Sequence, residues 1–172
     1  MSILTLHPLL RYSQHDVAPG HCCSILWDLR EPPIAIRHVT SISTAIDELE
    51  LSEHAITPPV SSLYIQCDIL PEPWPIEATN PYGVTIRDVL QAIYMCLQQQ
   101  LRHEEWDRMA EKHRGRISQV FDTRWRVAAE PILVHNQGVL RVDCILRHTL
   151  FGGLTISPES GDSCILTLRC PR

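Results

Sequence analysis

The chain has 172 residues, of which 44% are hydrophobic, and its net charge at pH 7 is −5. This length and composition predict one globular domain, residues 1–172, that can bury a core without disulfide bonds, and they exclude a disordered chain. Because the charge is negative and Lys and Arg form no run, nucleic-acid binding is not expected, and no stretch of about 18 apolar residues predicts a membrane span.

The N-terminal residues and the cysteines predict a cytoplasmic location. Residues 1–16 show no basic region followed by a sustained apolar stretch, which a secretory signal requires. The chain has seven cysteines, and an odd number fits reduced thiols better than a disulfide framework. We expect several of them to pack as small apolar residues.

Short extended segments are predicted before the middle of the chain. Residues 7–12 fit an edge strand, since Pro8 cannot occupy a strand interior. Residues 24–30 alternate in polarity and predict a strand, as do residues 62–70. Between them, residues 34–39 fit a further strand or an extended arm, and residues 43–49 fit a helical turn.

The middle of the chain predicts two helices. In the first, apolar residues recur every three or four positions from Ile86 to Leu101, with Thr85 as N-cap and Asp88 in the first turn. The second begins near His103 and continues to Phe121, with a position at Gly115 where it could break or kink. Residues 71–76, with three prolines, form a stiff extended connection before the first helix.

Further strands are predicted after the helices. Residues 124–134 are mixed, residues 139–147 alternate and predict a strand, and Gly152-Gly153 predicts a turn. A short strand at 154–156 and a last one at 164–170 follow. The predicted fold class is therefore α+β, with an antiparallel sheet of strands from both chain halves packed on the central pair of helices.

A set of short motifs extends over nearly the whole chain. In order they are HPLL, WDLR followed by PP, PWPI, VTIRDVLQAIY, EEW, RVDCIL and FGGL. Together they resemble a family of basidiomycete fungal proteins known only as a domain of unknown function. The resemblance implies a fungal origin and a single intracellular domain, and it transfers no catalytic residue.

Two charged pairs interrupt the apolar pattern of the predicted strands. Asp28 and Arg30 share one face of the first strand, and Arg141 and Asp143 share one face of a later strand. We favour an ion-pair network that fixes the register of neighbouring strands. The alternative is a charged cleft in which an Arg binds a carboxylate or phosphate and an Asp acts as a base.

Metal binding and nucleophilic catalysis have weaker support. The cysteines and histidines of His21-Cys22-Cys23, Cys144 with His148, and Cys164 with Cys170 lack the C-x-x-C spacing of a zinc site, so no metal site is predicted. No G-x-S-x-G turn occurs, although a Cys-His hydrolase stays an alternative. No cofactor is expected.

Tryptophans supply the last feature, and Trp27, Trp74 and Trp106 are the candidate ligand-binding residues. The simplest interpretation is that they anchor the sheet on the helices. They could also line an aromatic groove for a small apolar molecule or a protein partner. The predicted function is a non-catalytic ligand- or protein-binding module. The alternative is a small cofactor-free enzyme of fungal secondary metabolism with an Asp/Arg/His acid-base cleft.

Overall fold

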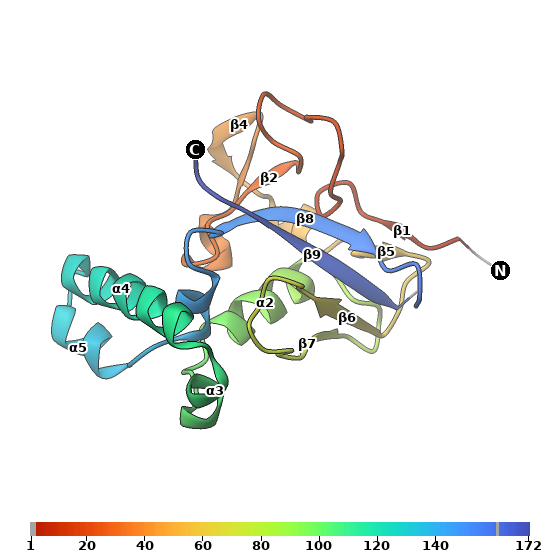
Figure 1. Ribbon diagram of the computed structural model, residues 1–172. Coiled ribbons are helices and arrows are strands. Elements are labelled where there is room, and N and C mark those ends of the chain that lie inside the picture. Colours follow the sequence, from red (N-terminus) through yellow and green to blue (C-terminus); the bar gives the residue numbers. More distant parts are fainter. Residues whose placement is uncertain (1–2, 161) are drawn as a thin grey trace.

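A four-stranded sheet joins the two halves of the chain in the computed structural model, which describes residues 3–160 and 162–172 (Figure 1). Its strand order is β7-β6-β9-β8, and the four strands are β6 (Ser62–Gln66), β7 (Ile76–Thr79), β8 (Leu150–Ile156) and β9 (Ser163–Arg169). The pairs β6–β7 and β8–β9 are antiparallel, and the central pair β6–β9 is parallel. The α+β fold class is confirmed, with the parallel pair formed where the two chain halves meet.

Strand β8 begins earlier than predicted. Gly152 and Gly153 lie inside it and do not form a turn, so that prediction was wrong. The register shifts between Phe151 and Gly153, and Gly153 has a φ of +109°. A Cβ atom on Gly153 would lie 2.7 Å from the backbone N and Cα of Tyr12, so this glycine permits close approach of another backbone segment.

Helix α2 (Ile86–Leu97) packs against β7 and carries the predicted apolar stripe into the core. Its N-cap is Thr85, whose hydroxyl accepts a hydrogen bond from the backbone N of Asp88 at 3.2 Å. The Asp88 carboxylate accepts in return from the backbone N of Thr85 at 2.9 Å. This reciprocal capping confirms the predicted helix start. Of the predicted stripe, Ile86, Val89, Leu90, Ile93 and Leu97 are buried, and Cys96, which lies outside that stripe, is buried with them.

The second predicted helix is divided into α3 (His103–Arg108) and α4 (Glu111–Val127). The break lies at Met109 and Ala110, which both have extended backbone angles, whereas Gly115 lies within α4 without interrupting it. Met109 is 7% exposed, so its burial in the core accompanies the change of direction. A further helix, α5 (Pro131–Asn136), packs on α4, and both lie to one side of the sheet (Figure 1).

The N-terminal part forms two small sheets. Strand β1 (Thr5–Leu6) pairs with β5 (Ile56–Thr57), and β2 (Ile25–Leu26), β3 (Arg37–His38) and β4 (Ser41–Ala45) form a three-stranded sheet. The 3₁₀ helix η1 (Pro33–Ala35) precedes β3, and helix α1 (Glu48–Leu51) follows β4.

Several predicted boundaries in the first half change. Of residues 24–30 only Ile25–Leu26 form a strand, although Ile25, Trp27 and Leu29 are all buried as the alternation predicted. Residues 8–10 form a turn, and the predicted strand at 62–70 ends at Gln66.

The predicted strand at residues 139–147 is wrong. These residues contain the 3₁₀ helix η2 (Arg141–Ile145), and all five of its residues are buried. The Asp143 carboxylate accepts a hydrogen bond from the backbone N of Leu140 at 2.8 Å, which closes a turn that a strand would not contain. The alternation of polar and apolar residues therefore did not indicate one exposed and one buried face.

Candidate functional site

The four predicted charged residues do not form one cluster, because η2 replaces one of the two strands that were expected to bring them together. Asp28 and Arg30 pair with each other: Arg30 Nε donates to Asp28 Oδ1 at 2.9 Å and Arg30 Nη2 to Oδ2 at 2.6 Å. Arg141 and Asp143 each pair with a helix instead. A catalytic role for these residues stays a prediction.

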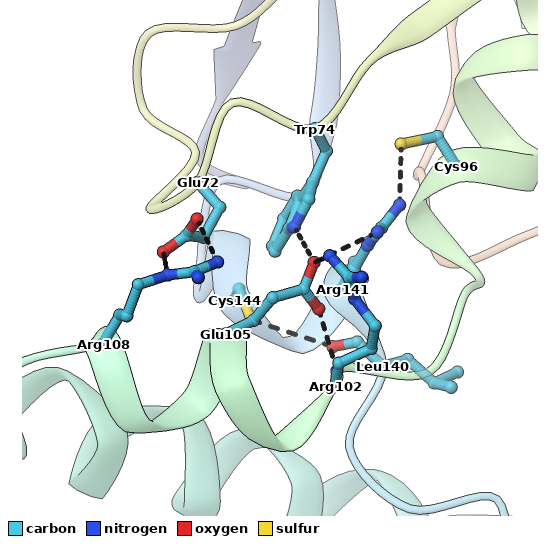
Figure 2. Close-up of polar contacts among 9 residues, drawn as sticks. All are labelled: Glu72, Trp74, Cys96, Arg102, Glu105, Arg108, Leu140, Arg141 and Cys144. Atoms are coloured by element: carbon cyan, nitrogen blue, oxygen red, sulfur yellow. Dashed lines mark hydrogen bonds and ion pairs between the residues drawn. The ribbon is translucent and has the colours of Figure 1, made fainter.

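Arg141 belongs to a buried polar cluster centred on Glu105 of α3, which is 1% exposed (Figure 2). Glu105 Oε1 accepts from Trp74 Nε1 at 2.9 Å and from Arg141 Nη2 at 3.2 Å. The backbone N of Arg102 donates to Glu105 Oε2 at 2.8 Å, and Arg102 Nη2 donates to Oε1 at 3.2 Å. Arg141 also lies over the Trp74 ring, with its Cζ 5.0 Å from the ring centroid.

The surroundings of Glu105 keep it ionised. Burial by itself would raise the pKa of this carboxyl, but the hydrogen bonds from Arg102 and Trp74 and the charge of Arg141 outweigh burial and lower the pKa to about 2. The groups that donate to Glu105 belong to Arg102 at the start of α3, to Arg141 of η2 and to Trp74 of the proline-rich connection. The cluster therefore joins these three segments. The motif EEW contains Glu105, but nothing in the helical pattern of the sequence indicated that Glu105 pairs with Arg141 and Trp74.

A second buried pair holds α4 to η2. Asp143 is 1% exposed, and its carboxylate accepts from Arg124 Nε at 2.8 Å and from Arg124 Nη2 at 2.9 Å. Arg124 Nη2 also donates to the backbone O of Gly138 at 2.9 Å. This two-point contact fixes the orientation of the guanidinium group and therefore the position of α4.

A cavity of about 1170 Å³ lies between α4 and the body of the protein, and we call it the α4 groove. One face of α4 lines it through residues spaced three or four apart, which are Arg116, Gln119, Val120, Thr123, Arg124 and Val127. The segment around η2 supplies apolar and polar lining, which includes Leu140, Val142, Asp143, Leu146, Arg147 and Thr149. Arg30 and Glu31 also contribute.

The polar lining of the α4 groove is net positive, with four Arg against Glu31 and Asp143. Arg30 and Arg124 are occupied by ion pairs, whereas Arg116 and Arg147 make no ion pair with any other described residue. The hydroxyl of Thr149, a residue 3% exposed, has no hydrogen-bond partner among the described residues. The groove thus offers two cations, Arg116 and Arg147, that have no ion-pair partner among the described residues.

The three candidate tryptophans occupy different places. Trp27 is 1% exposed, packs on Phe151 with ring centroids 5.8 Å apart, and donates from Nε1 to the backbone O of Glu31 at 2.9 Å. Trp106 is partly buried against the core. Trp74 lines a second hollow of about 820 Å³ together with Tyr64 and the neighbouring prolines. Neither cavity brings the three indoles together.

The cysteines are all free thiols, and burial raises the pKa of Cys23 to about 11 and that of Cys144 to about 12. Within residues 3–160 and 162–172, no group of three or more His, Cys, Asp or Glu side chains is arranged to hold a metal ion. No helix in that part of the chain has the length and apolar character needed to cross a membrane.

The fold and the groove define an α+β protein with a cleft beside a projecting helix. The sequence model of a family of unknown function, DUF6699, matches residues 25–163, and the chain belongs to this family. Comparisons with curated proteins and with solved structures found no match. The basidiomycete origin stays a prediction.

Proposed function

We propose that this protein is a non-catalytic binding module, and that the α4 groove holds a ligand that is apolar along one side and negatively charged. The observation that carries this proposal is the open face of α4, which lines a cavity of about 1170 Å³. Ligand pockets typically measure about 300–1,000 Å³, so the groove is large enough for a sizeable molecule or a short segment of chain.

The lining supports both parts of this ligand description. Val120, Val127, Val142 and Leu146 provide an apolar surface along the groove. Arg116 and Arg147 carry the unpaired positive charge, which attracts an anionic group and disfavours a cationic one.

The contacts support a binding role over the alternative of an acid-base enzyme. The alternative, an Asp/Arg/His acid-base cleft, needs an Asp or His that is available to exchange a proton with a substrate. Asp28 and Asp143 are both held by two hydrogen bonds from an Arg. No His or Cys is among the described residues that line the α4 groove.

A fluorescence titration with anilinonaphthalene sulfonate tests this proposal, because the probe combines apolar rings with a negative charge. We expect saturable binding to the native protein and a loss of affinity of several fold in Val127→Glu and in Arg116→Glu. The control for Val127→Glu is Ile132→Glu, because Ile132 is 79% exposed and Val127 is 77% exposed. The control for Arg116→Glu is Lys112→Glu, which reverses another charge on α4. Neither control residue lines the groove.

Far-UV circular dichroism would verify that all four variants keep their helices. The proposal would be overturned if the native protein bound the probe without saturation. It would equally be overturned if the groove variants bound the probe as tightly as Ile132→Glu and Lys112→Glu.

A further inference from the structure

We infer that the ligand of the α4 groove is an amphipathic α-helix of another protein, whose apolar stripe is flanked by carboxylates. This inference rests on the binding function proposed above and specifies the partner. It follows from the packing of α4, from the shape of its open face, and from the distribution of charge.

The first argument is that α4 lacks a packing partner along one face. Of its 17 residues only Ile117 is buried. On one side Phe121 and Trp125 contact His135 of α5, with ring centroids 5.8 Å and 5.1 Å apart. On the face that lines the groove, Arg124 is held by Asp143 of η2, whereas Arg116, Gln119, Thr123 and Val127 are exposed. This face carries Val120 and Val127 among polar residues, and Val142 and Leu146 line the groove beside it, so a partner helix with an apolar stripe has an apolar surface to pack on.

The second argument concerns shape. The groove-lining residues of α4 extend from Arg116 to Val127 at spacings of three and four. Rows of side chains at these spacings form the ridges and grooves into which a second helix packs. At a rise of about 1.5 Å per residue, this face is about 16 Å long, which matches three turns of a partner helix.

An extended peptide fits the groove less well than a helix does. Extended partners bind by adding a strand to an exposed sheet edge or as a polyproline segment in an aromatic-lined groove, and no aromatic residue is among the described residues that line the α4 groove. The α4 groove is lined by the side chains of a helix and of η2, and its nearest strand, β8, already pairs with β9 and forms isolated bridges with Arg11 and Asp28. Side-chain packing is therefore the means of recognition.

The third argument is charge. Between Glu111 and Val127, α4 has five Lys or Arg residues against two acidic ones, in a chain whose net charge is −5. Arg116 on α4 and Arg147 after η2 both line the groove without an ion-pair partner among the described residues. Carboxylates beside the apolar stripe of a partner helix would pair with these two groups, and a basic helix would be repelled.

A selection experiment tests this inference. The native protein would be used to select from a displayed library of helical peptides of about 15 residues, with apolar positions in a helical stripe and Glu or Lys at random beside it. We expect the selected peptides to contain an excess of Glu over Lys. We also expect a synthetic selected peptide to gain helical circular dichroism when it binds.

Charge-reversed variants locate the binding site. Binding of the selected peptide, followed by fluorescence anisotropy, should weaken about tenfold or more in Arg116→Glu/Arg147→Glu. It should stay unchanged in Lys112→Glu/Arg126→Glu, which makes the same charge change on α4 outside the groove lining. Equal weakening in both double variants would overturn the assignment to the groove.

The outcomes separate this inference from the proposed function. If no peptides are selected, or the selected ones lack the acidic bias, the helical partner is wrong. The groove would still be a binding site if anilinonaphthalene sulfonate bound and the groove variants weakened that binding, and the ligand would then be a small amphipathic anion. Failure of both the probe and the peptides would overturn both proposals.

Discussion

Replacing Glu105 by Gln tests the buried polar cluster most directly. The substitution keeps the size of the side chain and removes its charge, which leaves Arg141 as a cation that is 7% exposed and has no carboxylate partner among the described residues. Removing one member of a buried ion pair typically destabilises a protein by about 3–5 kcal/mol. We expect Glu105→Gln to lower the free energy of unfolding at pH 7 by an amount in this range.

The same substitution predicts a pH dependence. The pKa of Glu105 is lowered in the folded protein from 4.5 to about 2, so the ionised carboxylate stabilises the folded state at pH values above 4.5. That contribution is lost as the pH falls from 4.5 towards 2, because the folded state must then bind a proton at an unfavourable site. The difference in stability between the native protein and Glu105→Gln should therefore shrink over this window.

Urea unfolding at a series of pH values, followed by circular dichroism, measures both quantities. Glu104→Gln is the matched control, because Glu104 is the preceding residue on α3 and is exposed. The reasoning would be refuted if both variants were destabilised equally at pH 7. A difference between the native protein and Glu105→Gln that stayed constant down to the lowest pH would refute the role of the charge.

Three further predictions follow from other contacts. Asp143→Asn should accelerate hydrogen exchange across α4 but not across α2, since it removes the anchor of Arg124, whereas Asp122→Asn should leave α4 protected. Thr85→Ala should lower the free energy of unfolding by about 1 kcal/mol, measured by urea unfolding, because α2 loses its N-cap. Burial raises the pKa of Cys23 and Cys164 to about 11 and that of Cys144 to about 12, so these thiols should not react with iodoacetamide at pH 8. Peptide mapping of the treated native protein should find these three cysteines unmodified.

The elements that could be predicted from the sequence are those fixed by local signals. Helix α2 was predictable because its N-cap and its apolar stripe lie within one short stretch of chain. The burial of Trp27 and its neighbours was also predictable from alternation. The same reasoning failed at residues 139–147, because Arg141 and Asp143 alternate with apolar residues and are nevertheless buried. Their partners, Glu105 and Arg124, lie 36 and 19 residues away in the chain, and no local pattern reveals such pairs.

The candidate site was only partly predictable for a related reason. Arg30 and Asp143 were candidate residues, and both line the α4 groove. The groove residues on α4 depend on how α4 leaves α3, and the break between these helices contains neither Gly nor Pro. A continuous helix would have directed Arg116 and its neighbours elsewhere, so the groove follows from tertiary packing around Met109.

The five residues of η2 explain why α4 keeps its position beside the groove, although Ile117 is its only buried residue. Arg141 holds α3 through Glu105, and Asp143 holds α4 through Arg124, so two neighbouring ion pairs on one short turn fix both helices. Burial of apolar surface is non-directional and would allow α4 to slide, whereas a two-point contact between Arg124 and Asp143 specifies both distance and orientation. A helix fixed in this way can leave most of one face exposed without closing onto the body of the protein. The charged residues Arg141 and Asp143, for which the sequence favoured a structural ion-pair network over a catalytic cleft, thus support the groove in which we place the ligand.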